Sequence, residues 1–156
     1  MLRQIIKSGQ VALNRRARFD YAIDETIEAG VSFTGAEVKS VRFGLVSLAD
    51  SFVQSKGGNL VVKNMAIQRL PTANKLAGFD ERRDKRLLLH KSQIKRLCGK
   101  LNEKGATIVP MKLYFNNRGI AKVLLGVGFG KSKIDKREVI RKREWTKQKQ
   151  QLRMKN

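Results

Sequence analysis

The chain contains few of the side chains that zinc sites, disulfide frameworks and most active sites require. Its 156 residues include one cysteine, Cys98, and one histidine, His90. One cysteine excludes an internal disulfide framework and is typical of a reducing compartment. Because structural zinc sites take several Cys or His ligands, no metal site is expected. We predict a cytoplasmic protein that holds no metal and no cofactor.

Long apolar segments are also missing. No apolar run approaches the roughly 20 residues that cross a bilayer, so no membrane partner is expected. The N-terminal region lacks the continuous apolar stretch and the small-residue cleavage site of a secretory signal. Because residues 1–19 are basic and contain no acid, a mitochondrial transit peptide is the alternative interpretation of this segment.

Patterns that indicate catalysis are absent as well. The sequence has no GxxxxGK[ST] phosphate-binding loop. The adjacent carboxylates Asp24–Glu25 and Asp80–Glu81 lie in charged turn regions, where we expect them to be solvated. His90 precedes a predicted helix and Cys98 lies on its apolar side, so both favour structural roles. We therefore expect a protein that is not an enzyme.

Acidic residues are scarce relative to basic ones. The chain has 34 Lys or Arg and 13 Asp or Glu, a formal net charge of +21 and a sequence pI near 10.8. A basic excess of this size indicates a nucleic-acid partner, with an anionic membrane surface as the second possibility.

The C-terminal segment, residues 131–156, concentrates this charge. It carries eleven Lys or Arg against three acidic residues and few apolar ones. Such a segment buries too little apolar surface to offset its ordering entropy, so we expect it to be disordered until it meets a polyanion. The predicted organisation is a basic lead-in over 1–17, a folded body over 18–130 and a basic tail over 131–156.

The body has the patterns of a mainly β domain. Alternation of apolar and polar residues predicts a strand over 18–33, with a bend or bulge at Gly30. Runs at 51–54 and 60–70, joined through Gly57-Gly58, predict a hairpin, as do 107–115 and 119–129 around Asn116–Gly119. Residues 71–85 predict a long polar surface loop. About six strands in so short a chain favour a small OB-like barrel, a fold that binds oligonucleotides on one face.

Two to three helices accompany the strands. Thr34-Gly35-Ala36-Glu37 matches a capping box and predicts a short helix that ends at Gly44. A second helix is predicted from an apolar stripe at i, i+3, i+4 and i+7, made by Ile94, Leu97, Cys98 and Leu101.

Two basic groups in the body are candidate RNA contacts. Asn14 precedes a cluster of three arginines, Arg15, Arg16 and Arg18, whose planar guanidinium groups suit phosphates and bases. Lys39 and Arg42 lie on the polar side of the short capped helix. Solvated surface charge is the alternative for both groups.

Several motifs occur in the order and spacing of a known family. The sequence resembles the bacterial SsrA-binding protein (SmpB) family between about Asn14 and Trp145. The matching segments are NRRARFDY (14–21), EAG (28–30), TGAEVKSVRFG (34–44), RLLLHK (86–91), VPMKLYF (109–115) and GKSKIDKRE (130–138).

The resemblance implies a six-stranded oligonucleotide-binding barrel and a role in ribosome rescue by trans-translation. The body would bind the tRNA-like domain of transfer-messenger RNA as a monomer. The tail would become helical in the mRNA channel, beyond the decoding centre of a stalled ribosome.

Carried over by position, the RNA contacts implied by the resemblance fall on Asn14 and Glu28, with Lys39, Arg42 and Lys131 as helpers. The implied ribosome-contacting residues of the tail are Lys133, Ile134, Asp135, Lys136, Arg137, Arg141, Lys142, Arg143 and Trp145. Ile134 stands where many relatives have an aromatic residue or His, so base stacking is not expected there. Arg83–Arg86 replaces a Pro-rich stretch of many relatives, which predicts a more flexible loop and the loss of one phosphate contact.

Two other classes of function are alternatives. Composition alone is equally consistent with a small basic ribosomal or ribonucleoprotein structural protein, and the family motifs are what separate the two interpretations. An RNA-processing enzyme is disfavoured because the sequence shows no acid–base or metal-binding cluster.

Overall fold

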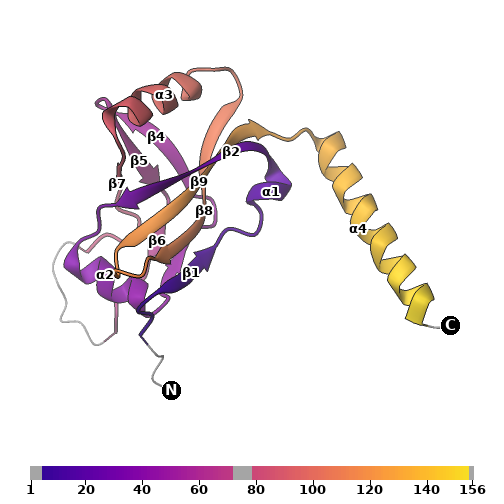
Figure 1. The fold of residues 1–156 in the computed structure, drawn as a ribbon, viewed down its shortest axis with the longest axis horizontal. Coiled ribbons are helices and arrows are strands. Elements are labelled where there is room, and N and C mark those ends of the chain that lie inside the picture. Colours follow the sequence, from indigo (N-terminus) through magenta and orange to yellow (C-terminus); the bar gives the residue numbers. More distant parts are fainter. Residues whose placement is uncertain (1–4, 72–78, 155–156) are drawn as a thin grey trace.

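A computed structural model describes residues 5–71 and 79–154 and shows a β-rich body with a long C-terminal helix (Figure 1). The strands are β1 (Gly9–Leu13), β2 (Tyr21–Val31), β3 (Val46–Ser47), β4 (Phe52–Lys56), β5 (Asn59–Lys63), β6 (Ala66–Ile67), β7 (Lys85–Leu88), β8 (Ala106–Phe115) and β9 (Ala121–Gly130). The helices are α1 (Ala17–Asp20), α2 (Gly35–Arg42), α3 (Lys91–Leu101) and α4 (Lys133–Met154).

Most strands form one antiparallel sheet of seven strands, in the order β1-β8-β9-β2-β7-β5-β4, while β3 pairs with β6 separately. The mainly β prediction is confirmed, but the sheet has seven strands and is not closed, because β1 and β4 are its two edges. Its curvature still brings both ends to one core, where Val53 of β4 and Leu113 of β8 are buried together.

The expected N-terminal lead-in is part of this sheet. Gly9–Leu13 forms β1 and pairs with β8, with a bulge between Gln10 and Ala12. Val11 and Ala12 pack against the main core, so residues 9–13 belong to the folded body.

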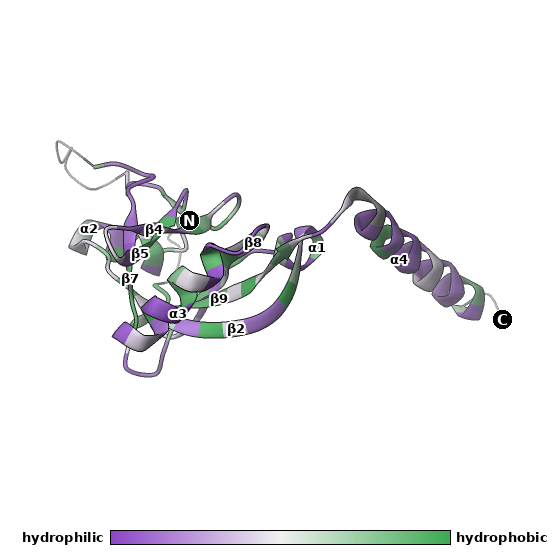
Figure 2. Ribbon diagram, turned by 90° about the horizontal axis from the view of Figure 1, so that it is seen from above, coloured by the Kyte–Doolittle hydropathy of each residue, from purple (hydrophilic) through white to green (hydrophobic). Residues whose placement is uncertain are grey.

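The three central strands bend where two of them carry a bulge. The bulges lie between Ile23 and Glu25 of β2 and between Pro110 and Lys112 of β8. On β9, which lies between these strands, a Cβ at Gly128 would be 1.9 Å from the Ala22 carbonyl oxygen. A second, smaller core covers this bend and contains Ala17, Val109 and Met111, with Tyr21 and Ile23 beside it. The helix α1 is thereby seated at the far end of the sheet (Figure 2).

Both predicted helices of the body are present. Thr34 and Glu37 form the reciprocal hydrogen bonds of a capping box at the start of α2, and Gly44 has a positive φ of 73° just after it. In α3, Leu97 is fully buried, and Ile94, Cys98 and Leu101 pack against the main core.

The segment predicted as a polar loop over 71–85 is instead anchored at its C-terminal end; residues 72–78 lie outside the described residues. Lys85 begins β7 and is fully buried, and its Nζ donates to the Met65 carbonyl at 2.6 Å. Arg83 donates to the buried Glu37 carboxylate at 2.6 Å, and Lys85 Nζ lies 4.0 Å from Glu37. Arg83 and Lys85 are thus held by the body, while the expected flexibility of Arg83–Arg86 relative to the family stays a prediction.

Two cations hold the Glu37 carboxylate ionised. Burial raises the pKa of Glu37, but the hydrogen bonds from Arg83 and from the Thr34 amide outweigh it and lower the pKa below the ordinary 4.5. Burial in turn lowers the pKa of Lys85, against the attraction of Glu37. The α2 helix is thus joined to β7 by a buried network of charges.

The basic tail is the helix α4, which projects from the body beyond the end of β9 (Figures 1 and 2). Its side chains are mostly hydrophilic and exposed along its length. Across residues 5–71 and 79–154, no helix combines the length and the apolar character needed to span a membrane.

We expect Glu37→Ala to lower the free energy of unfolding by about 3–5 kcal/mol, because it leaves the buried Lys85 without its counter-charge. Glu25→Ala is the matched control: it breaks the exposed ion pair with Arg96, 2.6 Å long, and should cost far less, because solvent screens this pair. Urea denaturation of the full chain measures both values. Equal losses in the two variants would contradict a special role for the buried network.

Candidate nucleic-acid interface

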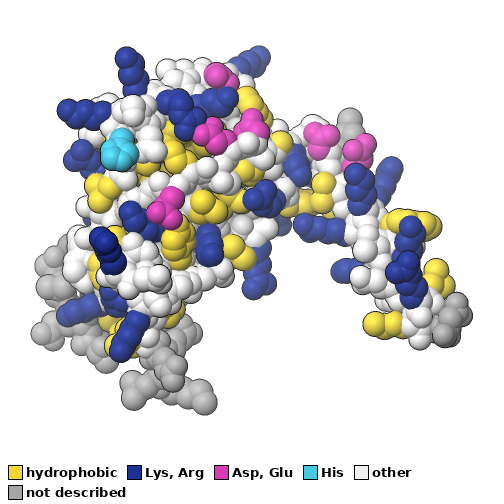
Figure 3. All heavy atoms as spheres, in the orientation of Figure 1, with side chains coloured by type: hydrophobic (Ala, Val, Ile, Leu, Met, Phe, Trp, Pro, Cys, Tyr) yellow, Lys and Arg dark blue, Asp and Glu magenta, His cyan; other side chains and the backbone are white. Residues whose placement is uncertain are grey.

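One side of the central strands is packed on the main core, and the opposite side, here called the outer face, is accessible. The core side carries Val123, Leu125 and Val127 of β9. By strand alternation, the outer face carries Lys122 and Leu124 of β9, Glu28 of β2, Lys112 and Tyr114 of β8 and Leu88 of β7. On the face of the body that Figure 3 shows, basic side chains are spread widely and outnumber acidic ones.

Glu28 is the acidic residue of the outer face, and Tyr114 holds it. Glu28 lies opposite Leu124, and Leu124 lies opposite Lys112, so the three strands place these residues in one row. The Tyr114 hydroxyl reaches diagonally across β9 and donates to Glu28 Oε2. Lys112 Nζ lies 5.3 Å from the centre of the Tyr114 ring.

This contact changes the acidity of the phenol. Burial, followed by the hydrogen bond to Glu28 and its negative charge, raises the pKa of Tyr114 to about 12. The hydroxyl therefore stays protonated and can donate at any physiological pH. With one oxygen of Glu28 held by Tyr114, the other oxygen can accept from a ligand that approaches the outer face.

An apolar side chain lies close to Glu28. Leu88 of β7 is opposite Gly30 and is 54% exposed. A Cβ at Gly30 would lie 3.1 Å from Leu88 Cβ, so the missing side chain leaves room for Leu88. A shallow cleft of about 440 Å³ continues from Glu28 past Leu88 to His90 at the start of α3. An acceptor beside exposed apolar surface suits contact with the edge and face of a nucleobase.

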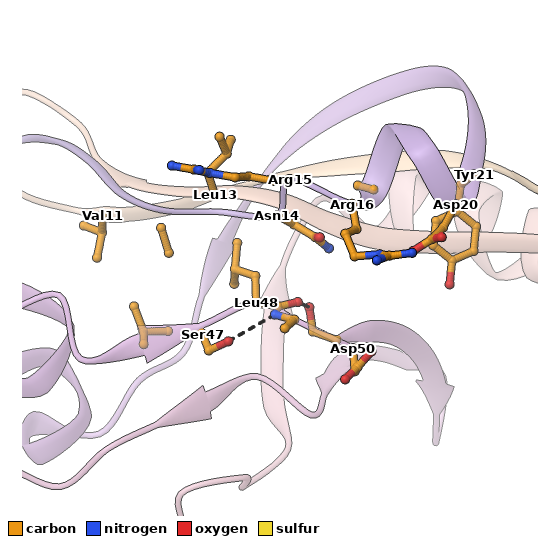
Figure 4. A pocket seen from close by; sticks show the side chains of 15 residues that line it. Val11, Leu13, Asn14, Arg15, Arg16, Asp20, Tyr21, Ser47, Leu48 and Asp50 are labelled. Atoms are coloured by element: carbon orange, nitrogen blue, oxygen red, sulfur yellow. Dashed lines mark hydrogen bonds and ion pairs between the residues drawn. The ribbon is translucent and has the colours of Figure 1, made fainter. Parts of the chain in front are cut away.

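Asn14 lies at the other end of the sheet. Its backbone N–H donates to Met111 and its side-chain Nδ2 donates to Pro110, so it is fixed at the β8 bulge. Its amide faces a cleft of about 430 Å³ (Figure 4). The opposite wall of the cleft contains Leu48 and Asp50, from the segment between β3 and β4.

Two residues of the predicted arginine cluster line this cleft, and the third lies on α1. Arg15 and Arg16 line it, and the side chain of Arg16 is 74% exposed, with its Nε 3.5 Å from Asp20. Arg18 is exposed on α1. These three arginines are exposed at the α1 end of the sheet, where their guanidinium groups are available to phosphates.

The two cations predicted on α2 differ in their surroundings. Lys39 is exposed and lines a separate groove with Arg69 and Phe79. Arg42 is half-buried: it donates to the Ile6 and Gly119 carbonyls at 3.1 Å each and stacks over the Phe115 ring. Arg42 therefore joins the N-terminal segment, the β8–β9 turn and the core. Its expected role as an RNA helper stays a prediction.

The predicted residues of the tail are in or beside α4. Lys131 Nζ donates to the Arg18 carbonyl at 2.9 Å, so it contacts α1. The side chains of Lys133 and Ile134 lie outside the described residues. Asp135, Arg137, Arg141, Lys142, Arg143 and Trp145 are exposed, while Lys136 is half-buried and pairs with Asp20 at 3.2 Å. Most of the predicted ribosome contacts are thus presented on one continuous helix.

Sequence reasoning missed Tyr114, Lys112, Lys122 and Leu88. The alternation of VPMKLYF placed Lys112 and Tyr114 on one side of a strand, but only the pairing of β8, β9 and β2 shows that Glu28 is their neighbour. Residues 5–71 and 79–154 contain no group of three or more His, Cys, Asp or Glu that could hold a metal ion.

Comparison with known proteins gives consistent matches. The family model described as "SmpB protein" matches residues 11–156. The SsrA-binding protein of Rhodopseudomonas palustris strain HaA2 is 47% identical over 142 residues, which cover 91% of this chain and 90% of that protein. The SsrA-binding protein of Rhodospirillum rubrum is 46% identical over 145 residues, 93% of this chain and 91% of that protein.

A solved structure is similar as well. It is called "tmRNA-SmpB: a journey to the center of the bacterial ribosome", and its matching chain has 45% identity and a TM-score of 0.66. The match covers 86% of this chain and 95% of that chain.

We expect Glu28→Gln to lower the pKa of Tyr114 from about 12 toward the ordinary 10.0, because a neutral neighbour no longer disfavours the tyrosinate. Burial of the phenol persists, so the pKa should stay above 10.0. A pH titration of ring carbon signals by NMR measures it, with Tyr21→Phe used to assign the two tyrosines. An unchanged pKa in Glu28→Gln would show that the two side chains are not in contact.

Proposed function

The chain belongs to the SmpB family of SsrA-binding proteins, and from this we propose that it binds transfer-messenger RNA and acts with it on the bacterial ribosome. The relatives are named as SsrA-binding proteins, and the similar solved structure concerns transfer-messenger RNA with SmpB on the ribosome. The protein is an RNA-binding factor that delivers this RNA to stalled ribosomes in trans-translation.

The observation that carries the proposal is the arrangement of Glu28 on the outer face. In a chain of net charge +21, a lone carboxylate that faces RNA would repel phosphates, and Tyr114 nevertheless holds it there. A carboxylate accepts from the N–H groups of base edges, which phosphates do not offer. We therefore assign Glu28 to a base and the surrounding cations to the RNA backbone.

The positions of the other side chains suggest how the tRNA-like domain lies. Leu88 and Lys122 border Glu28, and Lys112 and Tyr114 continue the outer face. Asn14, Arg15 and Arg16 lie at the α1 end of the sheet, beside the cleft of Figure 4. A structured RNA that lies along the sheet would place a base against Glu28 and Leu88. Its backbone would reach the arginines beside Asn14.

In this proposal the curved sheet binds RNA as an OB-like barrel does, although its edge strands β1 and β4 do not pair with each other. The tail enters the mRNA channel past the decoding centre, where its cations meet ribosomal RNA. In the free protein, the distal turns of α4 are disordered, because they have no apolar face to pack. The protein works in the cytoplasm, as a monomer and without a reaction of its own.

The test is a double-mutant cycle on RNA binding. Glu28→Ala should weaken binding of the tRNA-like domain by about 1–2 kcal/mol, roughly tenfold, because a charge-assisted hydrogen bond is lost. Tyr114→Phe should weaken it less, and the two losses should not add, because Tyr114 acts through Glu28. Filter binding at one fixed salt concentration measures all four proteins.

The matched control is Glu103→Ala, which removes an exposed carboxylate beyond the end of α3. It should leave affinity unchanged or slightly improve it, since the net positive charge rises. If Glu28→Ala behaves like Glu103→Ala while its fold is preserved, Glu28 does not contact the RNA.

A further inference from the structure

The first turn of the tail helix is attached to α1 by several contacts that the RNA-binding role does not require. The Lys131 backbone N–H donates to the Asp20 carbonyl at 2.9 Å, and Lys131 Nζ donates to the Arg18 carbonyl at 2.9 Å. Lys136 Nζ lies 3.2 Å from the Asp20 carboxylate. Burial raises the pKa of Asp20, but the hydrogen bonds from Lys136 and Arg16 lower it overall, so the carboxylate is ionised at neutral pH.

Phe19 provides the second part of the attachment. Lys136 Nζ is 5.9 Å and Arg143 Cζ is 5.8 Å from the centre of the Phe19 ring, and Arg16 Cζ is 5.2 Å away. Lys136 and Arg143 are seven residues apart and so lie on one face of the helix. Val139 lies on the same face and is half-buried, whereas its neighbours in sequence are exposed. The face of α4 that meets α1 therefore extends over about two turns, from Lys136 to Arg143.

We propose that α1 is a docking platform for the start of α4, with Phe19 and Asp20 as positioning residues that fix the direction in which the basic tail leaves the body. Tyr21, the next residue, pairs with Gly130, the last residue of β9. The platform and the start of the tail are therefore adjacent in the sheet itself, and two residues of connection separate β9 from α4.

Each contact of the platform is a surface interaction and weak by itself. Together these contacts hold α4 against the Phe19 ring and the Asp20 carboxylate. They have to restrict only the motion that a connection of two residues, 131–132, allows. The platform does not require the tail to be helical to its end: only the turns up to Arg143 touch it. This agrees with distal turns that order later, on the ribosome.

The consequence rests on the proposed function, whereas the docking itself does not. If the outer face binds the tRNA-like domain, a tail of fixed direction enters the mRNA channel at a set angle from that RNA. A freely swinging tail would have to search for the channel, because its many cations would contact any nearby ribosomal RNA.

Pulsed electron resonance measures the direction of the tail in the full chain. Spin labels are placed through Asn117→Cys in the β8–β9 turn and Lys142→Cys, an exposed position within the docked turns of α4, in a Cys98→Ser background. We expect a distance distribution with a distinct narrow component in the otherwise unaltered chain. The double variant Phe19→Leu with Asp20→Asn should lose that component, because the apolar bulk stays while the ring and the charge are gone.

Two single variants serve as controls. Asp20→Glu keeps the carboxylate and should keep the narrow component. Asp24→Asn removes an exposed charge four residues further along and should also keep it. The proposal is overturned if the parent labelled chain gives only a broad distribution, if the double variant stays narrow, or if Asp24→Asn broadens the distribution as much as the double variant does.

The same labelled chain separates this proposal from the function it builds on. If it fails to bind the tRNA-like domain of transfer-messenger RNA, the proposed function fails while a narrow distance still supports docking. If it binds that RNA but its tail distance is only broad, the proposed function stands and the platform is wrong.

Discussion

The register of β9 between β2 and β8 is the constraint on which both functional surfaces depend. At one end of β9 it sets Leu124 between Glu28 and Lys112, which lets Tyr114 reach Glu28. At the other end it sets Gly130 opposite Tyr21, which places α1 beside the first residues of the tail. A shift of one residue would move Glu28 to the core side and would carry the start of α4 away from Phe19 and Asp20.

Charge is distributed so that a strongly basic surface can coexist with a stable body. The few carboxylates pair with cations at points where an element must be held: Glu37 joins α2 to β7, Glu25 joins β2 to α3, and Asp20 joins α1 to α4. Most of these pairs are exposed and individually weak. The Glu37 network is the exception, since a buried lysine depends on it. The cations outside these pairs can bind RNA. Glu28 is the acidic residue of the outer face.

Local patterns predicted local structure well. The capping box at Thr34, the apolar stripe through Leu97 and the Gly57-Gly58 hairpin could be predicted because each depends on residues close together in sequence. Contacts between residues far apart in sequence could not be predicted: Arg83 and Glu37 are 46 positions apart, and Tyr114 and Glu28 are 86 positions apart. Charge also misled at Lys85, a basic residue that suggests surface but is fully buried with its Nζ on the Met65 carbonyl. The strand β1 was missed because it has only five residues and is flanked by basic side chains. Its partner strand, β8, lies about 100 positions later in the sequence.

Amide hydrogen exchange in Gly128→Ala, compared with Gly130→Ala, tests the central claim about β9 most directly. A Cβ at Gly128 would be 1.9 Å from the Ala22 carbonyl oxygen, whereas a Cβ at Gly130 would have nothing within 4 Å. The account predicts that Gly128→Ala loses protection along the pairing of β2 with β9 from Tyr21 to Ile23, while Gly130→Ala keeps it. Full protection of these amides in Gly128→Ala would contradict the account. It would show that β2 and β9 tolerate a side chain at Gly128, where the account requires the two strands to approach most closely.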